Sequence, residues 1–323
     1  MDDMQVFRDI LADIPVVEVE GVVFPKLFES NRPMAEHIEC IRALELNDND
    51  VLLCAYGKAG THWMWEMGSM LLAGRPDYDK RAKENVMMEA IEVEKLQALP
   101  SPRLLNTHLY PSMLPRDVKN KKVKVIHVYR NIKDVMVSAY FHWKRVPIAT
   151  RWTIEVMDKL FLDEKYVGGN YIMYMKKMAE FRKENPEVPV FNVSFEDMKK
   201  DPLGTVRLLA QFLGVPAPPE LCEQIADACG FQKMKEANDA KQLPEWLSSL
   251  GEVGDWKNHL TVAQSERLDA AVKELDGLDY HFRYTLHNKS RPFSQPANCR
   301  LGVEGREVGF PVTCTEKTRI FHV

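Results

Sequence analysis

The chain of 323 residues lacks several features that mark particular classes of protein. Its six cysteines are widely scattered and form no C-x-x-C pair, which argues against a disulfide framework or a zinc site and fits a reducing cytosol. No apolar run approaches the roughly 20 residues that a membrane-spanning helix needs. The N-terminal stretch MDDMQVFRDILADIP is acidic and too broken for a secretory signal. We therefore expect a cytoplasmic protein without a membrane span.

The chain also lacks an excess of positive charge. Its formal net charge is −4, so the sequence predicts binding neither to nucleic acid nor to an anionic membrane surface. Any site for an anion must therefore be built locally. Hydrophobic residues make up 45% of the chain and charged residues 28%, which is typical of a globular protein with a large core.

Apolar runs followed by helical patterns indicate the fold. Strands are expected at residues 51–56 (VLLCAY), 123–129 (VKVIHVY) and 189–193 (PVFNV), and a further short apolar run ends at Thr107 and His108. Helices are expected after Lys58 up to Gly74, over 130–143 and 203–213, and over 154–183 with a break near Gly168 and Gly169. Repeats of strand, loop and helix form right-handed βαβ units. The sequence predicts one α/β domain over residues 1–286, with a central parallel sheet flanked by helices. A tail over residues 287–323, rich in proline, glycine and polar residues, is expected to be loosely ordered or packed on the surface.

The stretch YGKAGTHW, residues 56–63, joins the first expected strand to its helix. Ligands of parallel sheets bind beyond the carboxyl ends of the strands, where the first-turn amides of Ala59 to Trp63 would favour an anion. Gly57 and Gly60 let the backbone approach a phosphate, and Lys58 adds a positive charge. The stretch predicts a P-loop-like phosphate cradle, although the G-x-x-x-x-G-K-[ST] pattern is absent. A loop that uses glycine only to turn the chain is the alternative.

Two further expected strands end in polar residues suited to anions. His108 follows one of them, and Arg130 follows the next, with Ser138 two helical turns further on. An arginine can bind an anion through a fork of donors. A surface histidine and a surface salt bridge are the alternative interpretations of His108 and Arg130. We interpret His127, which lies inside a strand, as a packing residue.

Together these segments resemble the cytosolic sulfotransferases, which move a sulfuryl group from 3′-phosphoadenosine-5′-phosphosulfate (PAPS) to an alcohol, phenol or amine. YGKAGTHW is similar to YPKSGTTW of that family, SPRLLNTHL to PRLLKTHL, RNIKDVMVSAYFHW to RNPKDVAVSYYHF, and FEDMKKDP to YEDMKKDP. GDWKNHLTVAQSE carries both a GDWK element and the K-x-x-x-T-V-x-x-x-E pattern of dimer contacts. The resemblance covers roughly residues 20–286.

The resemblance implies a role for each matching position. His108 would be the general base, and Lys58 would stabilise the leaving phosphate oxygen during in-line transfer. The residues implied for binding PAPS, and its product 3′-phosphoadenosine 5′-phosphate (PAP), are Lys58, Ala59, Gly60, Thr61, His62, Trp63, Arg130, Ser138, Phe195, Phe231, Met234 and Gly251. Position alone suggests Asn106, Phe141, His142, Trp143, Trp152 and Trp246 near the acceptor. A homodimer through Lys257, Thr261, Val262 and Glu266 is implied, and no metal is needed.

The sequence departs from the family pattern near the expected phosphates. Asn106 replaces a lysine, Phe195 replaces a tyrosine, and Ser249-Leu250-Gly251 replaces R-K-G. We therefore expect PAPS to bind more weakly than is typical of the family. The alternative function is a catalytically weak or inactive relative that binds nucleotide or a partner. A nucleoside or shikimate-type kinase would need the absent Walker A loop and a magnesium-binding residue.

Overall fold

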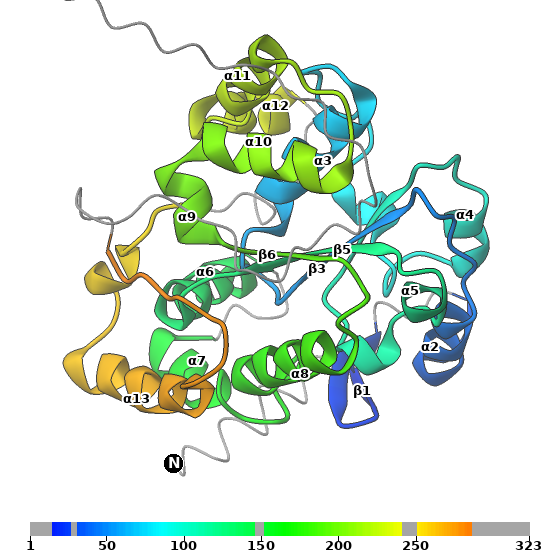
Figure 1. The fold of residues 1–323 in the computed structure, drawn as a ribbon. Helices are drawn as coiled ribbons and strands as arrows, with labels where there is room; N and C mark the ends of the chain where they lie inside the picture. The colour runs from blue at the N-terminus through cyan, green and yellow to red at the C-terminus, as the bar shows by residue number, and fades with distance from the viewer. Residues whose placement is uncertain (1–14, 27–30, 146–151, 241–250, 286–323) are drawn as a thin grey trace, which may run out of the picture. The chain divides into compact units, whose positions relative to one another are not determined.

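A computed structural model describes residues 15–26, 31–145, 152–240 and 251–285, with the side chains of 238–240 left out. In these residues, four parallel strands form a sheet in the order β4-β3-β5-β6 (Figure 1). The strands are β3 (Val51–Ala55), β4 (Leu104–Thr107), β5 (Lys124–Tyr129) and β6 (Val190–Ser194). All of β3 is buried, as expected for a parallel sheet covered on both faces. The predicted α/β fold with a central parallel sheet is confirmed.

Helices cover both faces of this sheet. Figure 1 shows α3 (Thr61–Ala73), α10 (Pro202–Leu213) and α11 (Pro219–Ala228) on one side, and α7 (Ile154–Leu160), α8 (Tyr171–Glu184) and α13 (Val262–Val272) on the other. The other helical segments are α2 (Met34–Arg42), η2 (Lys83–Val86), α4 (Val93–Gln97), η3 (Pro111–Met113), α5 (Asp117–Asn120), α6 (Ile132–Lys144), α9 (Phe195–Lys200), α12 (Phe231–Ala240), η6 (Asp255–Asn258) and η7 (Lys273–Leu275). No helix among the described residues has the length and apolar character to cross a membrane.

The carboxyl ends of three strands lie side by side. Cys54 of β3 pairs with Thr107 of β4 on one side and with His127 of β5 on the other. In the sheet, β4 lies on one side of β3, and the strand that follows it in the chain, β5, lies on the other side of β3. The strand order therefore reverses between β3 and β5. Such a reversal opens a crevice beyond the carboxyl ends, where ligands of open α/β sheets bind.

A buried ion pair closes the opposite, amino end of the sheet. The Arg103 guanidinium donates through Nε to Asp50 (2.9 Å), and the Arg103 amide donates to the same carboxylate (2.8 Å). Ser101 and the amide of Asn47 also donate to Asp50. The side chains of Arg103 and Asp50 are 2% and 0% exposed, so their charges depend on these bonds.

The structure shifts some predicted boundaries. Tyr56 lies just beyond β3, and Val123 and Pro189 lie before β5 and β6. The predicted break near Gly168 and Gly169 is confirmed, because α7 ends at Leu160 and α8 begins at Tyr171. The helix that ends at Gly74 is also confirmed: this glycine is left-handed, and its amide bonds the carbonyls of the last turn.

A hairpin near the N-terminus was not predicted. Strands β1 (Val16–Val19) and β2 (Val22–Pro25) pair antiparallel around Glu20 and Gly21, which both have positive φ. Two residues of positive φ suit a tight hairpin turn, and the E-G dipeptide between valine-rich runs was the signal for it.

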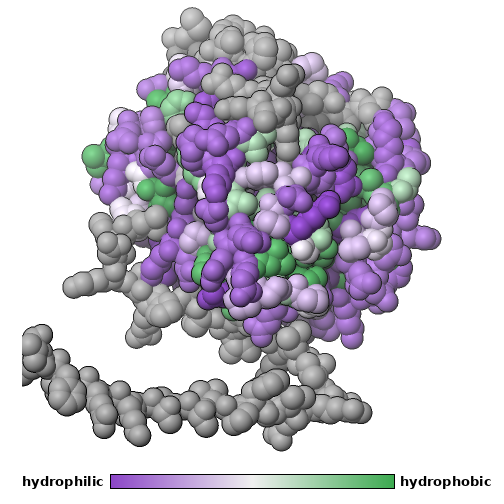
Figure 2. All heavy atoms as spheres, turned by 90° about the horizontal axis from the view of Figure 1, so that it is seen from above, coloured by the Kyte–Doolittle hydropathy of each residue, from purple (hydrophilic) through white to green (hydrophobic). Residues whose placement is uncertain are grey.

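From the viewpoint of Figure 2, hydrophilic residues cover much of the described surface, with smaller hydrophobic areas between them. The tail over residues 287–323 lies outside the described residues.

Candidate functional site

The loop between β3 and α3 has an unusual backbone. Lys58 has φ 69°, a left-handed value that side-chain-bearing residues rarely adopt, and Gly60 has φ 114°. A Cβ at Gly60 would lie 2.7 Å from the Phe195 ring, so only glycine fits there. At Gly57 an added Cβ would meet no described atom within 4 Å. Backbone strain of the kind seen at Lys58 is typical of binding sites, because the surrounding structure there holds the chain in an unfavourable conformation.

The first turn of α3 offers unpaired donors to this loop. Among the described residues, the amides of Gly60, Thr61 and Trp63 have no backbone partner, and the buried hydroxyl of Thr61 has none either. The expectation that the free donors begin at Ala59 is wrong, because its amide donates to the Tyr56 carbonyl (3.1 Å) and closes the turn. The remaining donors, at the start of α3, suit a phosphate or sulfate oxygen.

His108 is held beside the same loop. Its Nδ1–H donates to the Ala55 carbonyl oxygen (2.7 Å), and its amide donates to the carboxylate of buried Glu89 (2.7 Å). A carbonyl can only accept, so the proton of the neutral ring lies on Nδ1 and Nε2 keeps a free lone pair. Burial, followed by the charge of Lys83, lowers the pKa of His108 to about 4. The ring is therefore a neutral base at pH 7.

Lys58 lies half-buried among other cations. Burial, followed by the nearby charges of Lys83 and Arg130, lowers its pKa to about 7. Grouped positive charges in a partly desolvated site repel one another, and an anion relieves that repulsion. The arrangement therefore favours binding of a multiply charged anion.

Arg130 ties two loops to the end of β5. Its Nη2 donates to the Glu252 carbonyl oxygen (2.7 Å), and its Nη1 lies 3.5 Å from the Lys58 carbonyl oxygen. The guanidinium carbon lies 4.3 Å from the centre of the Phe195 ring. Arg130 is 4% exposed and its Nε is unpartnered among the described residues, which leaves a donor for a further acceptor.

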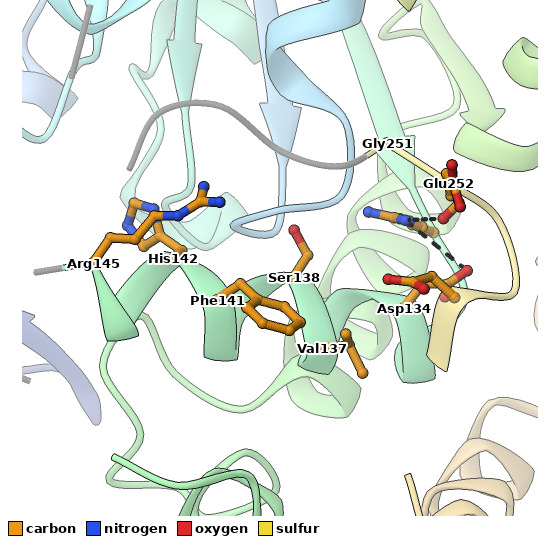
Figure 3. Close-up of a pocket in the computed structure, with 10 residues that line it drawn as sticks. Asp134, Val137, Ser138, Phe141, His142, Arg145, Gly251 and Glu252 are labelled. Carbon is orange, nitrogen blue, oxygen red and sulfur yellow. Dashed lines mark hydrogen bonds and ion pairs between the residues drawn. The ribbon is translucent and has the colours of Figure 1, made fainter. Parts of the chain in front are cut away.

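One face of α6 lines a pocket next to Arg130. In Figure 3, His142 and Arg145 lie at one end, Asp134 and Glu252 at the other, and Ser138 lies between them. The complete lining is Arg130, Asp134, Val137, Ser138, Phe141, His142, Arg145, Gly251, Glu252 and Asp255. The structure thus brings the predicted pair of Arg130 and Ser138 together. It also adds carboxylates that oppose an anion, and Arg145, which sequence reasoning missed although it follows Ser138 by two helical turns.

Aromatic side chains form a second part of the site. The Trp63 and Phe195 rings pack edge to face with centroids 5.6 Å apart. The ammonium of Lys199, which sequence reasoning missed, lies 5.1 Å from the Trp63 ring and 5.5 Å from the Phe231 ring. Phe231 is 47% exposed, and Gly251 lies against it. An exposed ring near a buried one can stack on a planar base.

The residues predicted near the acceptor do not gather in one place. Asn106 is fully buried, and Phe141 and His142 line the α6 pocket. The rings of Trp143 and Trp152 pack on each other with centroids 5.2 Å apart, as packing residues do. Trp246 lies outside the described residues. Of the remaining predicted residues, Met234 packs partly buried against the core, and His62 is the second residue of α3.

The predicted dimer segment is exposed in this chain. Lys257, Thr261, Val262 and Glu266 all face solvent, and Val262 is 74% exposed. Thr261 caps α13 through a capping box with Gln264, which fixes the direction of the segment.

In the described part of the chain, no three His, Cys, Asp or Glu side chains gather in a way that could hold a metal ion.

Comparisons with known proteins agree with this geometry. A family model described as the sulfotransferase domain matches residues 48–278. Sulfotransferase 1A1 of Mus musculus is 34% identical over 291 residues, covering 83% of this chain and 97% of the relative. Sulfotransferase 1C2 of Homo sapiens is 32% identical over 304 residues, covering 86% and 99%. Amine sulfotransferase of Oryctolagus cuniculus is 31% identical over 259 residues, covering 73% and 84%.

A solved structure extends the likeness to three dimensions. The crystal structure of mouse sulfotransferase SULT7A1 complexed with PAP matches with a TM-score of 0.67 at 25% identity, covering 82% of this chain and 96% of that one. The family match covers well over half of the chain and includes the loop after β3, His108 and Arg130. The chain belongs to the sulfotransferase family.

Proposed function

We propose that this chain moves the sulfuryl group of PAPS to a hydroxyl or amine of a small acceptor. The observation that carries the proposal is the fixed tautomer of His108, whose Nδ1–H donates to the Ala55 carbonyl beside the anion-suited loop. PAPS supplies an activated sulfuryl group on a phosphate that can leave. The rabbit amine sulfotransferase and the PAP-bound mouse structure support a donor and an acceptor of these kinds.

The residues present fit such a donor. The free amides of Gly60, Thr61 and Trp63 and the unpartnered Thr61 hydroxyl would hold the 5′-phosphosulfate. Trp63, Phe195 and Phe231 would contact the adenine, near Met234 and Gly251. Arg130 and Ser138, from the same pocket, would bind the 3′-phosphate. The acidic groups of that pocket agree with the expected weak binding.

His108 and Lys58 would perform the chemistry. Nε2 of His108 takes the proton of the acceptor as its oxygen or nitrogen attacks, because the ring is neutral at pH 7. The ammonium of Lys58 balances the negative charge that grows on the leaving phosphate oxygen. A positioned base contributes about 10²–10⁴ in rate, so the loss of His108 should be readily measured.

Transfer of labelled sulfate from PAPS to a panel of phenols, alcohols and amines tests the function. Lys58→Met and His108→Gln should each lower kcat by about 100-fold or more. His281→Gln and Lys177→Met, at exposed side chains, are matched controls that should retain the parent rate. Equal rates in all variants would contradict the assigned roles.

The second candidate function is a relative that binds nucleotide without transferring sulfate. The observation that favours it is the set of carboxylates, Asp134, Glu252 and Asp255, in the pocket of Arg130. Calorimetric titration with PAP separates the two candidates when combined with the transfer assay. PAP binding without transfer to any acceptor of the panel would favour the binding protein.

A further inference from the structure

Lys83 lies against the strand that ends at His108. Met87, just after η2, bridges to Asn106 of β4, and the Met88 amide donates to the Asn106 carbonyl (3.0 Å). The Asn106 side-chain amide donates to the Lys83 carbonyl oxygen (2.6 Å). Residues two apart along an extended chain project from the same face, so Asn106 and His108 share a face. The backbone of Lys83 is therefore fixed on the side of the sheet from which the imidazole projects.

The ammonium of Lys83 is largely withdrawn from solvent and acts on the site. The side chain is 15% exposed and pairs with the Glu84 carboxylate at 2.5 Å. The pKa of Lys58 and the pKa of His108 are both lowered, first by burial and next by the charge of Lys83. An ammonium that is largely shielded from solvent retains its effect on neighbouring charges, because little water screens it.

We propose that Lys83, whose backbone carbonyl accepts from Asn106 and whose ammonium pairs with Glu84, is a further residue of sulfuryl transfer that stabilises negative charge on the transferring group beside Lys58. This inference rests on the proposed function. Asn106 is neutral and fully buried, so β4 supplies no cation at this point and η2 supplies one instead. Keeping positive groups together in a partly desolvated site costs free energy that a bound anion offsets.

The structural alternative is an ion pair that only fastens η2 to β4. In that case Lys83→Met and Glu84→Gln should impair the protein equally, since each breaks the pair. Our proposal predicts unequal effects. Lys83→Met should lower kcat about tenfold or more, by analogy with the loss of one charge-stabilising donor. Glu84→Gln should retain or raise kcat, because it removes a carboxylate that competes for the ammonium, and Lys83→Arg should retain most activity.

The pKa of His108 in the protein without nucleotide gives a readout that needs no turnover. The charged groups that influence the pKa of this ring are Lys83, Lys58 and Glu84, and the Glu89 carboxylate accepts from its amide. We expect Lys83→Met to raise the pKa of the imidazole. The titration is followed by NMR, and the signal of His108 is assigned by comparison with the spectrum of His108→Gln. Glu84→Gln should lower it. Adding Asn106→Lys to Lys83→Met should restore both the rate and the lowered pKa, because it returns a cation to the same face.

Unchanged kcat and an unchanged His108 pKa in Lys83→Met would overturn the proposal, as would equal losses in Lys83→Met and Glu84→Gln. Lys83→Gln serves as a second neutral variant if Lys83→Met does not fold, as judged by its thermal melt. If the parent protein transfers sulfate to no acceptor, the proposed function fails. The titration of His108 then still decides whether Lys83 acts on this site.

Discussion

The imidazole Nδ1 of His108 lies 2.7 Å from the carbonyl oxygen of Ala55, so the ends of β4 and β3 are joined by the proposed base itself. The register explains the contact: Cys54 pairs with Thr107, and the next residues along the two parallel strands are therefore neighbours. Ala55 also leads into the loop that carries Lys58. The position of the base and the position of the phosphate-binding loop thus depend on the same pair of strands.

The first prediction concerns the pH dependence of transfer. Protonation of Nε2 removes the lone pair of the base, so kcat/KM should fall as the pH falls through the pKa of His108. That pKa is lowered to about 4, so we expect no loss between about pH 7 and pH 5. Rates over this range, with circular dichroism confirming the fold at each pH, check the prediction. An acid limb near the ordinary imidazole value of about 6.5 would contradict it.

The second prediction is proton uptake on nucleotide binding. Lys58 has its pKa lowered to about 7 in the free protein, so at pH 8 most molecules carry a neutral amine. Bound phosphates favour the charged form and raise this pKa, so PAP binding should take up a proton at pH 8 and little at pH 6. Calorimetry in buffers of different ionisation enthalpy measures the uptake. Lys58→Met is the control, and uptake that persists in it would exclude Lys58 as the source.

The third prediction concerns the pocket on α6. Ser138→Ala removes a hydroxyl beside Arg130 and should weaken PAP binding about tenfold, the value of a hydrogen bond to a charged group. Glu252→Gln removes a negative charge from the same pocket and should tighten PAP binding a few-fold. Dissociation constants from calorimetry test both variants. Changes of the same sign in the two would show that the pocket does not hold a phosphate.

The fourth prediction separates stability from function. Asp50→Ala leaves buried Arg103 without its carboxylate and should lower the free energy of unfolding by about 3–5 kcal/mol. The folded variant should retain the parent kcat, because the pair lies at the amino end of the sheet. Urea denaturation measures the loss, and Asp48→Ala, at an exposed position of the same turn, is the control. An Asp50 variant as stable as the parent would contradict the prediction.

Asp50 should also make stability depend on pH. Burial raises the pKa of its carboxyl, but the bonds from Arg103 and the neighbouring amides outweigh burial and lower the pKa overall. Its contribution is therefore present above the pKa of the unfolded chain and is lost as the pH falls through the folded value. The parent should lose more stability between pH 5 and pH 3 than Asp50→Ala does.

The fifth prediction concerns assembly. Val262 is 74% exposed at the start of α13, within the segment that resembles a dimer contact. A second copy of the chain would bury this side chain, so Val262→Glu should turn a dimer into a monomer without lowering the melting temperature of the monomer. Light scattering measures the mass. A parent protein that is already monomeric at micromolar concentration would refute the prediction.

The sequence alone identified the parts that local patterns encode. The apolar runs of β3 and β5 and the glycine after α3 predicted strands and a helix end, because burial and left-handed φ leave direct marks on residue type. The motif order also placed Lys58, His108 and Arg130 at three strand ends. Parallel strands align these ends, so their proximity followed from the fold class.

Only the tertiary structure decided how those residues act. The tautomer of His108 depends on a carbonyl 53 residues away in the chain, and the surroundings of Lys58 include Lys83 from a segment that matched no motif. Ala59 lost its expected role because its amide closes the turn. The tautomer of a histidine, the pKa of a side chain and the amides left without a partner all depend on contacts with residues distant in the sequence. A local sequence pattern does not identify those residues.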